Sequence, residues 1–184
     1  ERIGSQPSLG GRTLGVVGLG HIGAAVAVRA EALRLNVQWW GPRAKPGAAW
    51  PKAESLLALA QASDILVVCA RAEATNRGMV SREVIEAVGP QGMIVNVGRG
   101  QLIDEDALIS ALKDGRLWRA ALDVFVQEPT PAERWADVPN AVLTTHSAGA
   151  SNEALPLMVA QAIDNVRRFL AGDELASPVA AVDG

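Results

Sequence analysis

The sequence has little cysteine and no long apolar run, and both absences narrow the class of protein. Its single cysteine, Cys69, excludes an internal disulfide and suits a reducing compartment. No stretch of about 18 consecutive apolar residues occurs, so we expect no membrane span. Residues 1–10 lack the apolar core of a secretory signal. Together these features predict a cytoplasmic protein.

An excess of basic charge is also missing. The 17 Lys and Arg residues are outnumbered by 20 Asp and Glu residues, so the chain offers no electrostatic footprint for nucleic acid. Hydrophobic residues make up 49% and charged residues 20%, a composition typical of a folded domain rather than a disordered chain. We therefore expect a small-molecule ligand, with neither nucleic acid nor membrane as a partner.

Six short apolar segments separated by helical patterns indicate the fold class. They are rich in Val, Leu and Ile without strict alternation, which is typical of strands covered on both faces. Strands that alternate with helices predict an α/β fold, a doubly wound parallel (Rossmann) sheet with helices on both faces. The expected strands are 12–18, 36–41, 64–70, 92–97, 118–124 and 141–145.

The helices have their own signals. Asp104 is expected to cap a helix that Gly115 ends, a last helix is expected over 152–171 before Gly172, and the Pro/Gly-rich segment 41–51 is expected to be a loop. The buried face of the first helix is predicted from residues that recur with a helical period: Ile22, Ala25, Val26, Ala30 and Leu33.

The first predicted strand runs directly into Gly-Leu-Gly-His-Ile-Gly at 18–23 and then into that helix. Gly18 permits a tight turn, Gly20 lets the backbone approach a diphosphate, and Gly23 lets helix and strand pack closely. The helix N-terminus offers N–H groups and partial positive charge to an anion. This context predicts a dinucleotide site, the alternative being a glycine-rich turn without a ligand. His21 either contacts the phosphate or is simply solvated.

The end of the second predicted strand bears on the choice of cofactor. A carboxylate there would bind the adenosine ribose and repel the extra phosphate of NADP, but the position is Gly41. Arg43 and Lys45 follow, and a guanidinium suits a phosphate. We predict that NADP (NADPH) is preferred and NAD possible. The alternative is that the two cations are ordinary loop charges.

Polar side chains also follow three later strands, at the edge where the cofactor is expected. Arg99 can bind a substrate carboxylate, and His146 can give a proton to a carbonyl oxygen. Glu128 can orient the imidazole, and Asp123 can accept a hydrogen bond from the nicotinamide amide. Each residue alone has a structural explanation, but the set indicates hydride transfer to a 2-keto acid.

Four stretches carry a resemblance to a known family: GRTLGVVGLGHIG, VNVGRGQLIDEDAL, AALDVFVQEP and TTHSAG. In order and spacing the chain resembles the cofactor domain of the D-isomer-specific 2-hydroxyacid dehydrogenases. The resemblance implies Arg99 as the binder of the substrate carboxylate, His146 as acid/base and Glu128 as its partner. Gly41 followed by Arg43 is similar to the NADP-using glyoxylate and hydroxypyruvate reductases of that family.

The resemblance also implies residues that line the cofactor. Cys69 is expected to pack or make a backbone contact there rather than act as a nucleophile, and Trp135 either lines the substrate pocket or packs. No metal ligand is predicted. The predicted cofactor-binding residues are Gly18, Gly20, His21, Ile22, Gly23, Arg43, Lys45, Cys69, Ala70, Thr75, Val97, Gly98, Asp123, Ala148 and Gly149.

Departures from the family pattern shape the expected domain organisation. Before the residue matching Thr75, the family usually has a proline and a threonine, whereas this sequence has Ala70, Arg71 and Ala72. A second departure is that no segment matching the family's N-terminal substrate half is found. We expect a dinucleotide-binding domain over 1–150. Residues 151–184 are expected to form a helix and tail returning toward a substrate domain whose N-terminal part is absent from this chain.

The predicted function is NADPH-dependent reduction of a small 2-keto acid, of the glyoxylate or hydroxypyruvate type, to the D-2-hydroxy acid. As the cofactor-binding part alone, the chain would turn over slowly or not at all. Because family members usually dimerise through this domain, we expect a homodimer. The alternatives are a dehydrogenase with another substrate, such as phosphite, and a corepressor-like dinucleotide-sensing module without turnover.

Overall fold

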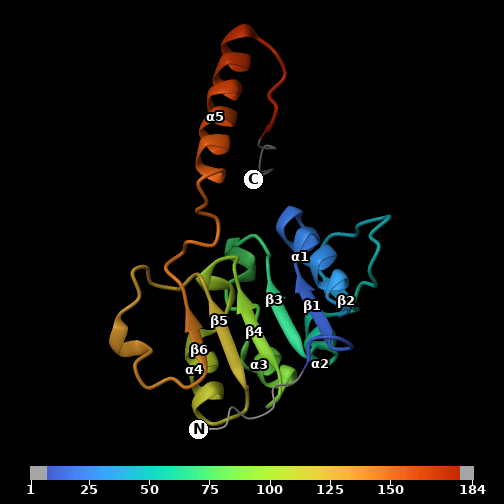
Figure 1. Ribbon diagram of the computed structural model, residues 1–184, viewed down its shortest axis with the longest axis vertical. Coiled ribbons are helices and arrows are strands. Elements are labelled where there is room, and N and C mark those ends of the chain that lie inside the picture. Colours follow the sequence, from blue (N-terminus) through green and yellow to red (C-terminus); the bar gives the residue numbers. More distant parts are fainter. Residues whose placement is uncertain (1–7, 179–184) are drawn as a thin grey trace. The chain divides into compact units, whose positions relative to one another are not determined.

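The computed structural model describes residues 8–178, which divide into two compact units after Thr145. The first seven residues of the expected domain, and the tail beyond residue 178, lie outside the described part. The first unit contains a six-stranded sheet of order β2-β1-β3-β4-β5-β6, in which every neighbouring pair is parallel (Figure 1). Its strands are β1 (Thr13–Val17), β2 (Asn36–Trp40), β3 (Ile65–Val68), β4 (Met93–Asn96), β5 (Arg119–Leu122) and β6 (Ala141–Leu143). The six predicted strands and the α/β class are confirmed.

The strand register aligns the carboxyl ends of all six strands. The last residues of the strands pair with one another in the order Trp40, Val17, Val68, Asn96, Leu122 and Leu143. The residues that follow therefore form one row along this edge: Gly41, Gly18, Cys69, Val97, Asp123 and Thr144. Because β2 and β3 lie on opposite sides of β1, the winding reverses there, and ligands of such sheets bind at this kind of crevice.

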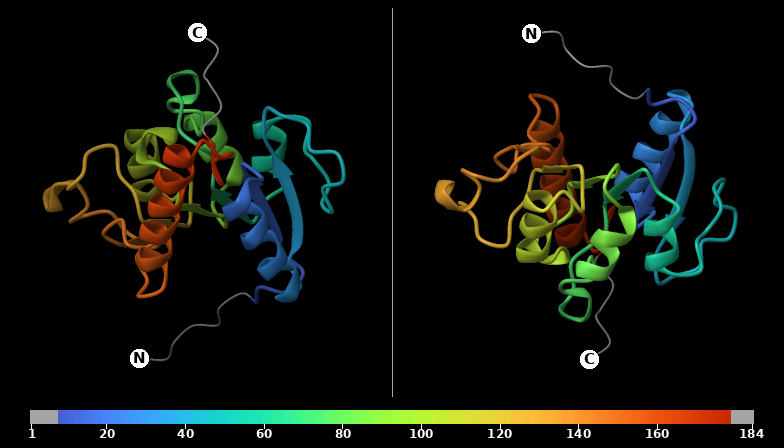
Figure 2. Two further views of the ribbon diagram at one scale, coloured as in Figure 1. Left: turned by 90° about the horizontal axis from the view of Figure 1, so that it is seen from above. Right: turned by 90° about the horizontal axis from the view of Figure 1, so that it is seen from below.

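Helices cover the two faces of the sheet unequally. Figure 2 shows α1 on one side, with α3 and α4 on the other. The side chains of Ser55 and Asp104 cap α2 and α4 by accepting hydrogen bonds from Ala58 N and Ala107 N, at 3.0 and 2.9 Å. The Asp104 cap confirms a sequence prediction. The helices of this unit are α1 (His21–Ala32), α2 (Leu56–Gln61), α3 (Arg82–Val88) and α4 (Glu105–Lys113), with 3-10 turns η1 (Ala74–Asn76), η2 (Gly100–Leu102) and η3 (Ala132–Arg134).

The apolar core forms two layers, one on each face. Leu59, Ile85 and Leu108 bring α2, α3 and α4 onto one layer, and all three are fully buried. Ala27 of α1 packs into the other layer with Val16. Successive strand residues point to opposite faces, both of which are covered, so β3 (Ile65–Val68) is apolar throughout, as its sequence predicted.

The predicted buried face of α1 is confirmed in part. Ala30 is buried and Val26 packs against the core, as predicted, but Ile22 and Leu33 are each 58% exposed, and the other buried residues are Gly23 and Ala27. Small side chains let α1 lie close to the sheet, and large apolar ones do not fit there. Periodicity identified the helix, but close packing selected a partly different face.

The second unit begins at His146 and contains α5 (Ala154–Ala171), which ends at Gly172 with a left-handed φ of 76°. Its start lies two residues beyond the predicted one and its end agrees. No helix within residues 8–178 is both long and apolar enough to cross a lipid bilayer. The apolar side chains of α5 that are 46–78% exposed are Leu155, Leu157, Met158, Val159, Ile163, Val166, Phe169 and Leu170.

Candidate functional site

A cavity of 490 Å³ lies at the carboxyl edge of β1, β2 and β3. It is the crevice that the reversal of strand order predicts. Seven of the predicted cofactor-binding residues line it: Gly18, Gly20, Arg43, Lys45, Cys69, Ala70 and Thr75. Residues from the ends of three strands are thus brought together around one space.

Two glycines of the turn at one wall of this cavity leave no room for a side chain. Gly18 has a φ of 90°, and a Cβ atom there would lie 2.7 Å from the Cα of Ala70. A Cβ on Gly23 would lie 2.2 Å from the carbonyl oxygen of Gly18, whereas one on Gly20 would face open space. Gly18 and Gly23 therefore serve packing, and Gly20 keeps the N-terminus of α1 open to an anion.

The loop that carries Arg43 and Lys45 is held against β2 by Trp39, which is only 2% exposed. The Trp39 indole donates a hydrogen bond from Nε1 to the carbonyl oxygen of Trp50, at 3.1 Å. The Nζ atom of Lys52 lies 5.4 Å from the Trp39 ring centroid, in a cation–π contact. The loop is therefore anchored at its far end, and its two cations line the cavity.

Cys69 is a half-buried thiol in the cavity wall. Burial raises its pKa to about 11, so the thiol is protonated at neutral pH. Its backbone N–H donates to the carbonyl oxygen of Val17, at 2.9 Å. These features favour packing and backbone contact over nucleophilic chemistry.

Arg99 lies in a turn that a buried side chain shapes. Asn96, 1% exposed, accepts a hydrogen bond from Gly98 N at 3.0 Å on Oδ1 and donates from Nδ2 to the carbonyl oxygen of Arg99 at 3.1 Å. The exposed Arg99 side chain donates to the carbonyl oxygen of Gly98, at 2.7 Å. Sequence reasoning missed Asn96, although an amide at the end of a buried strand is a signal for such a role.

The turn after Arg99 packs directly on the segment that carries Glu128. A Cβ on Gly100 would lie 1.9 Å from the carbonyl carbon of Phe125, so only glycine fits there. Glu128 in turn accepts a hydrogen bond from Phe125 N on Oε1, at 2.9 Å. The structure therefore brings together the two backbone segments that present Arg99 and Glu128.

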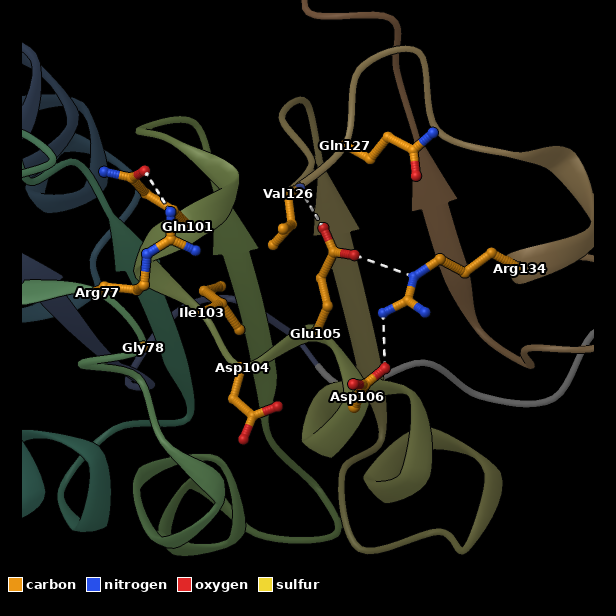
Figure 3. A pocket seen from close by; sticks show the side chains of 10 residues that line it. All are labelled: Arg77, Gly78, Gln101, Ile103, Asp104, Glu105, Asp106, Val126, Gln127 and Arg134. Carbon is orange, nitrogen blue, oxygen red and sulfur yellow. Dashed lines mark hydrogen bonds and ion pairs between the residues drawn. The ribbon is translucent and has the colours of Figure 1, made fainter.

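Glu105 stabilises the same segment from the first turn of α4. Its carboxylate is 7% exposed and accepts hydrogen bonds from Val126 N at 2.5 Å and Arg134 Nε at 3.1 Å (Figure 3). The hydrogen bond to Asp106, followed by that to Glu105, raises the pKa of Arg134 above its usual value. These side chains line a second cavity of 450 Å³, which lies apart from the glycine turn and contains none of the predicted site residues.

Asp123 is 6% exposed and lies in the row of residues at the strand ends. It accepts a hydrogen bond from Thr144 Oγ1, and the backbone N–H of Thr144 donates to the carbonyl oxygen of Leu122 at 2.9 Å. Trp135, considered above as a lining residue, is 7% exposed and packs edge-on against Phe125, with ring centroids 5.8 Å apart. Its role in this unit is packing.

His146, Ala148 and Gly149 belong to the second unit. His146 is exposed and has a left-handed φ of 55°, and Ala150 N donates to the carbonyl oxygen of Ser147 at 2.9 Å, forming a tight turn. The roles of these residues stay predictions. Predicted residues of the first unit that do not line the cofactor cavity are His21, Ile22, Gly23, Val97, Gly98 and Asp123.

Within residues 8–178 no group of three or more His, Cys, Asp or Glu side chains is arranged to hold a metal ion.

Several cavity residues were absent from the sequence-based prediction. A signal was available for Arg71 and Glu73, since both follow the third strand closely, at the edge where ligands bind. The additional residues lining the cavity include Trp39, Trp40, Arg71, Glu73, Asn76 and Met79.

Comparison with known proteins gives a consistent family. Residues 2–148 match the family "D-isomer specific 2-hydroxyacid dehydrogenase, NAD binding domain". A glyoxylate/hydroxypyruvate reductase A of Arabidopsis thaliana is 39% identical over 169 residues, covering 92% of this chain and 54% of the relative. A hydroxyphenylpyruvate reductase of Plectranthus scutellarioides is 38% identical, with 92% and 54% covered. The chain thus spans about half the length of the curated relatives it matches.

A solved structure shares the same fold. It is the NADPH-dependent glyoxylate/hydroxypyruvate reductase of Sinorhizobium meliloti in complex with NADP and malonate. It has a TM-score of 0.89 and 37% identity, and the match covers 94% of this chain and 54% of that one. The chain therefore belongs to the D-isomer-specific 2-hydroxyacid dehydrogenases and contains the NAD-binding domain of that family.

Proposed function

We propose that this chain is the NADPH-binding part of a reductase that converts a small 2-keto acid, of the glyoxylate or hydroxypyruvate type, to the D-2-hydroxy acid. The observation that carries the proposal is the cavity that joins the glycine turn to Arg43 and Lys45. Gly41 places no carboxylate at the end of β2, so a 2′-phosphate meets cations rather than an anion. The NADP-bound relative supports the same choice of cofactor.

The residues present fit a dinucleotide at this site. The open N-terminus of α1 beside Gly20 suits the diphosphate, and the cavity between the ends of β2 and β3 suits the adenosine end. When bound, the reduced nicotinamide supplies the hydride. Asp123, buried in the row at the strand ends, would hold the carboxamide and so fix the ring face presented to the substrate.

Three further residues are assigned to the substrate. Arg99 would bind the substrate carboxylate, and its exposed side chain on a turn held by hydrogen bonds suits that task. His146 would give the proton to the keto oxygen, and Glu128 would hold the imidazole in its protonated form. The fixed backbone between Gly100 and Phe125 supports this assignment, because it sets the spacing of Arg99 and Glu128.

The domain organisation follows from the same reading. We assign residues 1–150 to dinucleotide binding and residues 151–184 to a helix and tail that return toward a substrate domain. Because the chain covers 54% of its relatives, it would bind dinucleotide while turning over slowly or not at all by itself. A homodimer in the cytoplasm is part of the proposal, and sedimentation equilibrium tests the dimer.

Calorimetric titration of the 184-residue chain with NADPH and with NADH tests the cofactor assignment. We expect NADPH to bind at least about tenfold more tightly, since hydrogen bonds to a charged group contribute roughly 1.5–3 kcal/mol. Equal or tighter binding of NADH would contradict it. Rapid reduction of glyoxylate or hydroxypyruvate by this chain alone, at ordinary enzyme rates, would contradict the assignment as a cofactor-binding part.

One observation favours a second function, a dinucleotide-sensing module that binds another protein. The apolar side chains of α5 are strongly exposed, with Phe169 at 73% and Leu170 at 78%. The two functions differ in their need for catalytic side chains. If Arg99→Ala and His146→Ala leave the cellular role intact, sensing replaces catalysis; if they abolish it, the reductase stands.

A further inference from the structure

Arg71 is a cavity residue that the proposed chemistry does not use. It follows β3 and lines the same 490 Å³ cavity as Arg43 and Lys45, which follow β2. Because β1 lies between β2 and β3, Arg71 and the other two cations enter this cavity from strands on opposite sides of the glycine turn. The cavity therefore has basic side chains on both walls.

The backbone at Arg71 is held in place. Asn76 donates a hydrogen bond from Nδ2 to the carbonyl oxygen of Arg71, at 2.9 Å, and accepts one from Glu73 N on Oδ1, at 2.8 Å. The preceding residue, Ala70, packs on Gly18 so closely that any Cβ there would lie 2.7 Å from its Cα. Arg71 is thus a long, exposed side chain on an anchored backbone, one residue from the contact with the glycine turn.

The charge of the cavity favours a polyanion. Its lining contains three cations, Arg43, Lys45 and Arg71, against one carboxylate, Glu73. NADPH differs from NADH by one phosphate on the adenosine ribose, which in such folds lies beyond the second strand, near Arg43. A guanidinium facing that ribose from the other wall would bind the same phosphate, in the bidentate geometry that lysine lacks.

We propose that Arg71 is a specificity-determining residue, forming the second arm of a cationic clamp on the 2′-phosphate of NADPH opposite Arg43. The clamp rests on the proposed NADPH-binding function. It selects NADPH over NADH because the third cation is directed at the one group that the two cofactors do not share.

The test is calorimetric titration of the 184-residue chain and its Arg71→Leu and Arg71→Lys variants with NADPH and NADH. Arg71→Leu should weaken NADPH binding about tenfold and change NADH binding less than about twofold. Arg71→Lys should lie between wild type and Arg71→Leu for NADPH. Arg77→Leu is the matched control, because Arg77 hydrogen-bonds Gln101 at 3.4 Å and does not line this cavity. It should leave both affinities unchanged.

The outcomes separate the clamp from the function on which it rests. A wild-type chain without preference for NADPH overturns both. A wild-type preference that survives Arg71→Leu overturns the clamp alone, and so does an equal loss for both cofactors, which would place Arg71 on the shared part of the dinucleotide. Circular dichroism of each variant identifies a misfolded protein, and Arg71→Lys then carries the test.

Discussion

Two regions along the carboxyl edge of the sheet are built differently, one around β2 and β3 and the other around β4 and β5. On the cofactor side, around β2 and β3, exposed cations stand on short segments that Trp39 and Asn76 anchor. On the side of β4 and β5, buried polar groups such as Asn96 and Glu105 hold backbone atoms directly. A substitution on the first side should therefore change binding with little effect on stability, whereas one on the second should cost stability.

The largest loss of stability should come from the contact between the segment after β4, which contains Gly100, and the segment after β5, which contains Phe125. Gly100→Ala places a Cβ 1.9 Å from the carbonyl carbon of Phe125, and backbone cannot yield cheaply, so we expect a loss of about 3 kcal/mol or more in the free energy of unfolding. Urea unfolding followed by circular dichroism measures it. Gly20→Ala is the control, because its Cβ would meet no atom within 4 Å. Similar stability losses in both variants would refute the difference between the two sides.

The next effect concerns the buried carboxylate on the same side. Glu105→Ala removes the acceptor of Val126 N and one partner of Arg134, so we expect a loss of about 2 kcal/mol in unfolding free energy. Glu105→Gln keeps an acceptor for Val126 N and should lose less. The same unfolding titration compares them. An unchanged stability in Glu105→Ala would show that the loop before Glu128 does not depend on this carboxylate.

On the cofactor side, Arg43→Ala should reduce NADPH affinity about tenfold, or about 1.4 kcal/mol, while NADH affinity and thermal stability stay within error. The reason is the loss of a cation from the cavity wall without loss of a buried contact. Calorimetry and thermal melts provide the two readouts. The control is Arg29→Ala on α1, whose guanidinium bonds only its own helix in the contacts described. A lower melting temperature in Arg43→Ala, together with its weaker NADPH binding, would contradict the expectation that this substitution affects binding but not stability.

The smallest effect is a pH dependence from Cys69. Its folded pKa, about 11, lies above the value of 9.0 for an exposed thiol. This thiol therefore contributes stability that is complete below pH 9.0 and is lost as the pH rises through about 11. Cys69→Ala should flatten the fall in melting temperature over that range. An identical slope in the variant would show that other groups cause it.

Sequence patterns predicted the strands and the glycine turn because they depend on local chemistry. Strand-length apolar runs and the spacing of Gly18, Gly20 and Gly23 carry that information directly. The buried face of α1 was predicted only in part: Ala30 is buried as expected, but Gly23 and Ala27 pack on the sheet in place of Ile22 and Leu33, because the side that packs depends on how closely the helix approaches the sheet. Asn96 and Arg71 were missed as site residues, although both stand at or just after the end of a buried strand. Which of the polar residues there hold a turn or line the cavity depends on contacts that only the folded chain makes.

The sequence alone determined that this chain is a parallel α/β domain with a phosphate-binding turn and no carboxylate at Gly41, because periodicity and residue type at strand ends are local properties. Only the tertiary structure decided which side chains share the cavity, and that Gly100 and Glu105 hold the segment before Glu128. The physical reason is that strand register and close packing join residues far apart in the chain.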